Sequence, residues 1–151
     1  MRTRRPSGSR SPQAPTHWPE LIHSEARWQW EDLRGWVEDL ARRFRFDSRT
    51  VPPCWYRHNG MVEALSALYD YELACFSLSE SKRTAVDWLR ALNDVEALLR
   101  GWAARSGCTV NQHRDDPDTA IRVDDADWAR FIRADEERRG AIPLALALDD
   151  E

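Results

Sequence analysis

Two pairs of cysteine and histidine carry the clearest chemistry in this sequence. Cys54 and His58 form a Cys-x3-His pair, and Cys108 and His113 form a Cys-x4-His pair. Two thiolates with two imidazoles are a ligand set of tetrahedral structural Zn²⁺ sites, and thiolate sulfur favours zinc over calcium or magnesium. Four protein ligands would leave no open coordination position. The sequence therefore predicts a closed, structural zinc site made of these four residues.

The same cysteines allow other interpretations. Cysteine is often buried as a small hydrophobic residue, and the separation between the two pairs is not that of a zinc finger or ribbon. A disulfide and a reactive thiol are further alternatives. Cys54 and His58 would suit a nucleophile and its base, but no Gly-rich anion loop or paired acid accompanies them, so we predict a protein that is not an enzyme. For Cys75 we predict a place in the core.

Helices are the elements that must bring the two pairs together. Apolar residues recur at helical spacing over three segments, which predicts helices at residues 24–46, 61–76 and 84–106. The repeating positions are Trp30, Leu33, Val37, Leu40 and Phe44 in the first helix, Met61, Leu65, Leu68 and Glu72 in the second, and Trp88, Leu92, Val95, Leu99 and Trp102 in the third. Thr84 and Asp87 have the spacing of a capping box, and Gly107 suits the left-handed residue beyond a helix end.

The order of these helices predicts how the two pairs meet. A short polar turn joins the second and third helices, so we expect them to form an antiparallel αα-hairpin. The start of the second helix then lies at the same end as the exit of the third, and Cys75 lies at the opposite end. We therefore predict an all-α fold, a small three- to four-helix bundle with disordered termini.

The two ends of the chain differ in charge from the middle. We predict that residues 1–16 are a disordered basic arm, because they are polar and carry Arg2, Arg4, Arg5 and Arg10. Residues 17–113 are the expected helical domain. Residues 114–151 hold twelve acidic residues and six arginines, and we expect an acidic extension there, with one short helix carrying Trp128, Phe131 and Ile132 and a tail that includes residues 144–148. With a net charge of −4, only the arm offers a basic segment for nucleic acid.

The sequence also limits where the protein can be located and what kind of partner it can bind. No apolar run approaches the roughly 18 to 20 residues of a membrane span, and no apolar signal segment follows the basic N-terminus, so we expect a cytoplasmic protein without membrane contact. Trp55, Tyr56 and Arg57 are candidates for an exposed patch that binds another protein, since aromatics and arginine are common interface anchors. The alternative is a buried aromatic pair beside an arginine that reaches solvent. A second copy of this chain is one candidate partner.

One stretch resembles a known family. The features are the run Pro52-Pro53-Cys54-Trp55-Tyr56-Arg57-His58, then Val62, Glu63, Leu65 and Leu68, then Trp88 in a helix that Gly107 and Cys108 follow. Together they resemble an uncharacterised family of small actinobacterial proteins whose function is unknown, over residues 28–113. The chain departs from that pattern at Asn59 and Gly60, where a proline usually follows the histidine.

The resemblance implies a setting rather than an activity. Proteins of this kind are often encoded on phages, plasmids and integrative elements, which implies an accessory protein of a mobile element. We therefore expect a non-enzymatic accessory or interaction protein, stabilised by zinc. The alternative function is a DNA-associated accessory factor that uses the basic N-terminal arm.

Overall fold

The computed structural model describes residues 16–77, 81–118 and 121–140, and within these ranges it is all-α, as predicted. The elements in chain order are the 3₁₀ turn η1 (Trp18–Glu20), helix α1 (His23–Phe44), the 3₁₀ turn η2 (Trp55–Arg57), and helices α2 (Asn59–Cys75), α3 (Arg83–Ser106) and α4 (Asp125–Gly140). The chain divides into two compact units, Met1–Asp116 and Pro117–Glu151, and each is described by itself.

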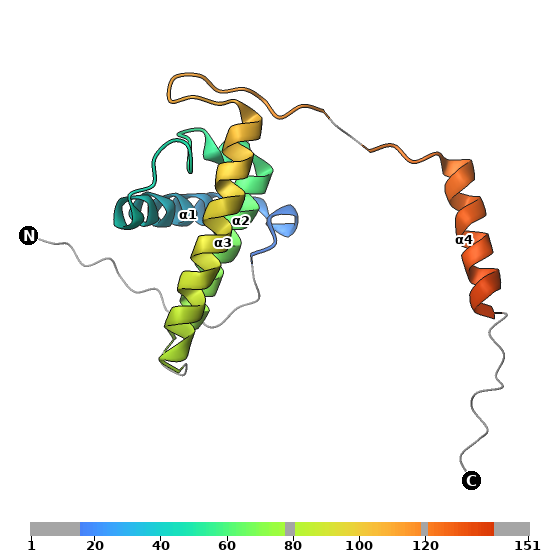
Figure 1. The fold of residues 1–151 in the computed structure, drawn as a ribbon, viewed down its shortest axis with the longest axis horizontal. Coiled ribbons are helices and arrows are strands. Elements are labelled where there is room, and N and C mark those ends of the chain that lie inside the picture. Colours follow the sequence, from blue (N-terminus) through green and yellow to red (C-terminus); the bar gives the residue numbers. More distant parts are fainter. Residues whose placement is uncertain (1–15, 78–80, 119–120, 141–151) are drawn as a thin grey trace, which may run out of the picture. The chain divides into compact units, whose positions relative to one another are not determined.

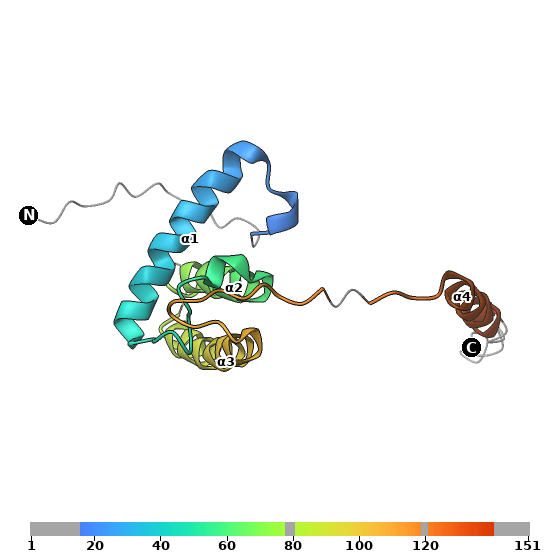
Figure 2. The same ribbon diagram turned by 90° about the horizontal axis from the view of Figure 1, so that it is seen from above.

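Helices α2 and α3 form the antiparallel hairpin that the short turn predicts. They run side by side in both ribbon views, and α1 crosses the pair (Figures 1 and 2). The start of α2 and the end of α3 lie at one end, which we call the metal end. The opposite end, from Cys75 to Thr84, is the turn end. This arrangement brings residues 54–58 and 108–113 to the same end of the hairpin.

The core of the first unit is built from the predicted helix faces. The buried apolar side chains are Leu33, Trp36, Val37, Leu40, Trp55, Met61, Val62, Leu65, Leu68, Cys75, Trp88, Leu92, Leu99 and Ala103. Trp30, expected on the core face of α1, is instead 37% exposed. Its ring packs against Trp18, with centroids 4.3 Å apart, at the edge of the core rather than inside it. The helical period nevertheless identified the right face of α1, because Leu33, Val37 and Leu40 are buried.

Polar contacts join α1 to α2 beside this core. The carboxylate of Glu72 accepts hydrogen bonds from the indole N–H of Trp36 at 2.5 Å and from Arg43 at 2.9 Å. The hydroxyl of Tyr69 donates to Asp32 at 2.9 Å. Glu72 stands on the predicted inner face of α2, and these two partners explain how a carboxylate is accommodated there.

The helix ends follow the sequence signals only in part. Gly107 has φ 66° and ends α3 in the left-handed conformation, as predicted. Arg45 ends α1 in the same conformation, with φ 58°, although it is not a glycine. The predicted capping box at Thr84 is wrong. The helix begins at Arg83, and the Thr84 hydroxyl donates instead to the carbonyls of Cys75 and Ser81, at 2.6 and 2.7 Å.

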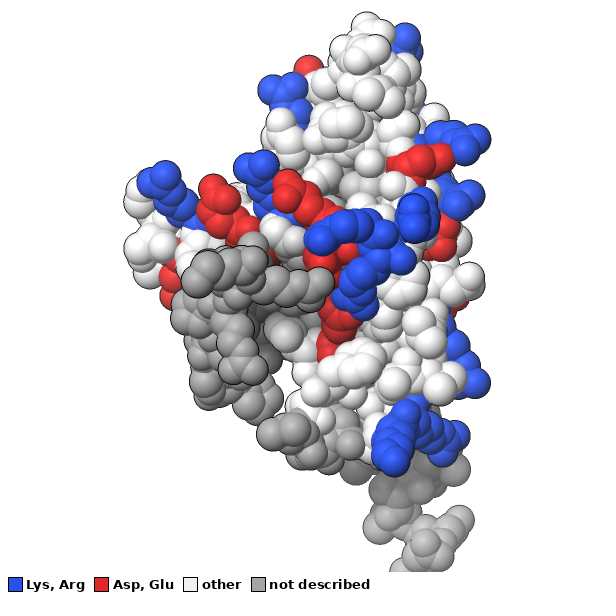
Figure 3. All heavy atoms as spheres, turned by 90° about the vertical axis from the view of Figure 1, so that its left-hand side faces the viewer, with Lys and Arg blue, Asp and Glu red and all other residues white. Residues whose placement is uncertain are grey.

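Exposed charges of both signs cover the helices. Figure 3 shows basic and acidic side chains lying beside one another on one face of the molecule. Several of the exposed ion pairs lie at helical spacing, such as Arg34 with Glu38 on α1 and Arg100 with Glu96 on α3. Such exposed pairs contribute little to stability, about 0–1 kcal/mol each.

The second unit contains the predicted short helix. The carboxylate of Asp124 accepts a hydrogen bond from the backbone N–H of Asp127 at 2.7 Å and so caps α4. Trp128 and Phe131 are 55% and 59% exposed, and their rings stack with centroids 6.2 Å apart. Of the predicted disordered arm at residues 1–16, residues 1–15 lie outside the described residues, as does the tail at residues 144–148. The backbone N–H of Thr16 is described and donates to Asp70 at 2.8 Å. No described helix is both long and apolar enough to cross a membrane.

Candidate metal centre

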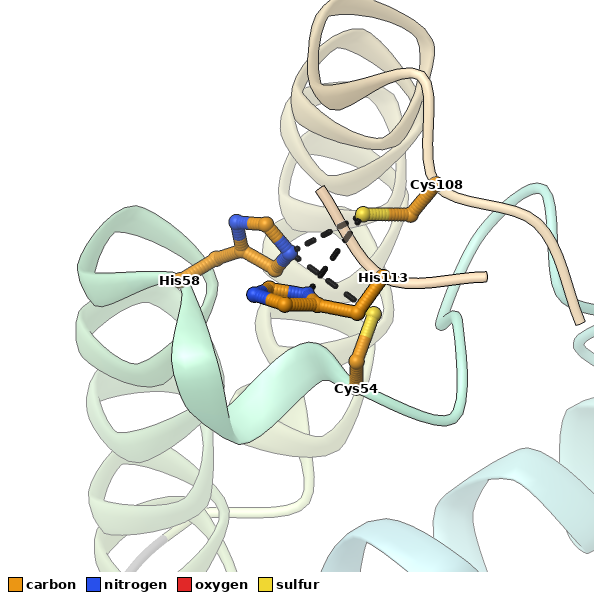
Figure 4. A group of neighbouring side chains, drawn as sticks. All are labelled: Cys54, His58, Cys108 and His113. Atoms are coloured by element: carbon orange, nitrogen blue, oxygen red, sulfur yellow. Dashed lines mark hydrogen bonds between the residues drawn. The ribbon is translucent and has the colours of Figure 1, made fainter. Parts of the chain in front are cut away.

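Four side chains from two distant segments meet at the metal end of the hairpin (Figure 4). Cys54 and His58 flank the single turn η2, and His58 immediately precedes α2. Backbone hydrogen bonds fix this turn, since Arg57 N–H donates to Cys54 C=O at 2.9 Å and His58 N–H donates to Trp55 C=O at 3.1 Å. Cys108 and His113 come from the loop that follows α3.

Close packing between α2 and α3 makes this meeting geometrically feasible. A Cβ atom added at Gly60, in the first turn of α2, would lie 2.7 Å from Cε2 of Trp102 on α3. Only glycine lets that indole ring lie against the α2 backbone. The left-handed Gly107 then turns the chain out of α3 and delivers Cys108 to the site.

The spacing of the four donor atoms suits one metal ion. All four lie within 4.8 Å of one another. The sulfur of Cys108 is 3.3 Å from Nε2 of His58 and 3.8 Å from Nδ1 of His113, and the sulfur of Cys54 is 3.7 Å from Nε2 of His58. A tetrahedral ion with metal–sulfur bonds of about 2.3 Å and metal–nitrogen bonds of about 2.05 Å holds sulfur and nitrogen about 3.6 Å apart. The observed distances scatter around that value.

Two carboxylates orient the imidazoles. Asp116 accepts a hydrogen bond from Nδ1 of His58, and Asp115 accepts one from Nε2 of His113, both at 2.8 Å. Each carboxylate places the ring proton on the outer nitrogen, so the lone pair of the inner nitrogen faces the sulfurs. A histidine that binds a metal through one nitrogen and a carboxylate through the other is a common arrangement in metal sites.

The two histidines differ in their surroundings. The side chain of His58 is 3% exposed, and that of its partner Asp116 is 55% exposed. The side chain of His113 is 17% exposed, and Asp115 is almost fully exposed. Burial lowers the pKa of His58, but the hydrogen bonds with Asp116 and Cys108 outweigh it, and that pKa lies above its ordinary value. His58 is therefore the more firmly positioned donor.

The two thiols also differ, because the surroundings shift their pKa values in opposite directions. Burial alone would raise the pKa of Cys108, but hydrogen bonds to its thiolate outweigh burial and lower that pKa to about 6. They involve Ser106, the backbone N–H of Arg114, which is 3.2 Å from the sulfur, Cys54 and His58. Burial and the neighbouring Cys108 raise the pKa of Cys54. A thiolate is the form that binds metal, so one sulfur is already in that form near neutral pH.

The structure thus brings together the four predicted residues in an arrangement that could hold a metal ion. Cys75 is 6% exposed and belongs to the core, as predicted. Asp115 and Asp116 were missed, because in the sequence they counted only among the acidic residues of the C-terminal extension. Acidic residues two and three positions after the candidate ligand His113 were the available signal.

The predicted interaction residues occupy different environments. Trp55 is 7% exposed and packs in the core, and the Tyr56 side chain is 54% exposed. Arg57 is also exposed. Partner binding by these residues stays a prediction.

Comparisons with known proteins do not assign this chain to a family. Comparison with protein-family models, with curated proteins and with solved structures found no match. The resemblance to an actinobacterial family therefore stays a prediction, and the function is inferred from the geometry of the site.

Proposed function

We propose that this protein is a zinc-stabilised helical interaction module in which one Zn²⁺ ion fastens the metal end of the α2–α3 hairpin. The observation that carries the proposal is the cluster of two sulfurs and two imidazole nitrogens within 4.8 Å, with a carboxylate behind each imidazole. Packing into a hydrophobic core would require only side chains of suitable shape. It would not explain why two sulfurs and two imidazole nitrogens lie together.

The donor set favours zinc. Two sulfurs and two nitrogens in a tetrahedron suit Zn²⁺, whereas calcium and magnesium take oxygen ligands in larger numbers. Four protein ligands fill a tetrahedral shell and leave no position for a substrate or a reactive water. This supports a structural role and agrees with our expectation that the protein is not an enzyme.

The bound ion would hold a polar loop that has little other support. Residues 108–116 follow α3 and are mostly exposed, with one backbone turn bond from Thr109 N–H to Gln112 C=O at 2.9 Å. Ligation of Cys108 and His113 would tie this loop to η2, so the free energy of metal binding would add to the free energy of folding.

We infer the interaction role because a loop and a hairpin end held by zinc would offer a fixed surface to a partner protein. A module without an open metal position would act by binding a partner, and the sequence resemblance implies an accessory protein of a mobile element. For the DNA-associated alternative, the residues needed are Arg2, Arg4, Arg5 and Arg10, which lie outside the described residues. No described feature favours that alternative.

Metal analysis and cobalt substitution test the proposal. Protein purified without chelators should contain about one equivalent of zinc by elemental analysis. Replacement by Co²⁺ should give the intense visible absorption of tetrahedral, thiolate-bound cobalt. Cys75→Ala serves as the matched control and should keep both results, whereas Cys108→Ser should lose both. Protein that neither contains zinc nor takes up Zn²⁺ or Co²⁺ after reduction would refute the proposal.

A further inference from the structure

A groove of about 530 Å³ lies beside the loop that carries Cys54. One wall is formed by Trp30, Glu31, Arg34 and Glu38 of α1, and the other by Pro53, Trp55 and Tyr56. In the second wall, Pro53 immediately precedes the ligand Cys54, and Trp55 and Tyr56 of η2 lie between the ligands Cys54 and His58 in the chain. Neither the metal centre nor the hydrophobic core accounts for this groove.

Aromatic rings form much of its lining. The centroids of Trp30 and Trp55 are 6.5 Å apart, and those of Trp55 and Tyr56 are 6.1 Å apart with the two rings perpendicular. Trp55 is buried, whereas Trp30 and Tyr56 are 37% and 54% exposed. Rigid, partly exposed aromatic rings are frequent anchors of binding surfaces because they offer a large contact area at a low entropic cost.

The charge of the groove selects among ligands. Arg34 donates a hydrogen bond to Glu38 at 2.9 Å, and this pairing raises the pKa of the guanidinium. Glu31 adds a further negative charge to the same wall. Aromatic faces and carboxylates together attract a cation, whereas the carboxylates repel the phosphates of a nucleic acid.

We propose that this groove binds an extended, proline-containing peptide segment of a partner protein that also carries an arginine. Aromatic-lined grooves accept the flat faces of proline rings in the polyproline II conformation, which loses little entropy on binding. The arginine would lie over Tyr56 and approach Glu31. The inference rests on the proposed function, because ligation of Cys54 would fix the loop that forms the second wall.

Peptide binding to the full chain tests this proposal. The probe is a fluorescein-labelled peptide of sequence Ala-Pro-Pro-Arg-Pro-Pro-Ala, and fluorescence anisotropy reports its affinity. Tyr56→Ala should weaken binding about five- to thirtyfold, as expected for a central aromatic anchor. Tyr71→Ala is the matched control, because Tyr71 is 41% exposed on α2 and does not line the groove. It should leave the affinity unchanged.

Charge variants and other probes complete the test. Glu31→Gln should weaken binding about two- to fivefold, the effect of losing one exposed cation contact, whereas Glu63→Gln should not. A peptide with glutamate in place of arginine should not bind, and neither should a single-stranded oligonucleotide. Binding of the oligonucleotide, or equal affinities of the Tyr56→Ala and Tyr71→Ala proteins, would overturn the proposal. Tighter binding of a peptide of residues 1–15 would assign the groove to the chain's own arm and also overturn it.

Zinc content measured on the same samples separates this proposal from the proposed function. Zinc-loaded protein that does not bind the peptide refutes the groove alone. Protein that lacks zinc but binds the peptide refutes the zinc module and leaves the groove intact.

Discussion

The two ends of the α2–α3 hairpin are held by different chemistry. At the turn end, Cys75 is buried, the ring of Phe76 meets that of Trp88 edge-on with centroids 6.0 Å apart, and the Thr84 hydroxyl bonds to the Cys75 carbonyl. At the metal end, four metal-binding side chains converge, with two carboxylates behind them. One end depends on apolar packing, and the other depends on a polar cluster that an ion can organise.

The comparison shows that neighbours decide what a cysteine does. Cys75 is buried in the core cluster and packs there as a small hydrophobic residue. Cys54 and Cys108 face imidazole nitrogens, and the pKa of Cys108 is lowered to about 6. Removal of metal should therefore weaken one end of the hairpin and leave the other intact, and the predictions below test that contrast.

Loss of a ligand should have the largest effect. Cys54→Ser should abolish binding of one zinc equivalent and lower the free energy of unfolding by more than about 4 kcal/mol, since loss of a structural metal is among the most damaging single changes. Cys75→Ala should keep the zinc and cost only about 1 kcal/mol. Urea denaturation and elemental analysis of both proteins measure the difference. Equal losses of stability, with zinc retained in both, would remove the distinction between the two ends.

The next largest effect should come from Gly60. Gly60→Ala places a Cβ atom 2.7 Å from the Trp102 ring, so the ring or helix α2 must shift. We expect a loss of about 1–3 kcal/mol, as for other overpacked sites, and weaker zinc binding because the metal end opens.

A second helical glycine provides the control for Gly60. At Gly101 the added Cβ meets only the flexible end of Arg105, at 3.3 Å. Gly101→Ala should therefore stabilise the protein, by up to about 1 kcal/mol, through helix propensity. Thermal denaturation of both proteins, with and without zinc, measures these changes. A Gly60→Ala protein as stable as the Gly101→Ala protein would show that the contact between α2 and Trp102 does not hold the metal end together.

Substitution of the carboxylates behind the imidazoles should have a smaller effect, which is a loss of zinc affinity. Asp116→Ala should weaken zinc binding about ten- to a hundredfold, because the buried His58 ring loses the acceptor that orients it. Asp115→Ala should have less effect, because Asp115 is 97% exposed and water can replace its carboxylate. Competition with a chromophoric chelator measures both affinities. A larger loss in the Asp115 variant would reverse our assignment of His58 as the firmly held donor.

The helices and the meeting of the two cysteine–histidine pairs could be predicted from local sequence. The 3.6-residue period of the apolar residues predicted helices at nearly the observed bounds, and the short turn between α2 and α3 implied that Cys54 and Cys108 would meet. These predictions succeed because they depend on residues close together in the chain or on simple topology.

Features that depend on tertiary contacts were not predicted. Thr84 has the spacing of a capping residue, but its hydroxyl bonds to the Cys75 carbonyl across the turn. Asp116 matters because it reaches His58, 58 positions away in the chain. Arg45 adopts a left-handed conformation that local preference assigns to glycine. The Thr84 and Asp116 contacts form only after folding, whereas the backbone N–H groups of Arg45 and Phe46 close α1 locally, on the Ala41 carbonyl.

Removal of either of two hydroxyls should have the smallest effects. These two variants also give the most direct test of the difference between the turn end and the metal end. Thr84→Ala removes the hydroxyl that closes the turn end and should cost about 0.5–1.5 kcal/mol, with zinc affinity unchanged. Ser106→Ala removes a hydroxyl at the metal end, where its oxygen accepts the backbone N–H of Cys108 at 3.2 Å. It should cost a similar amount and also weaken zinc binding, because Cys108 is less well positioned. If both variants weaken zinc binding equally, the two ends are coupled through the helices, and the hairpin must be treated as a single cooperative unit.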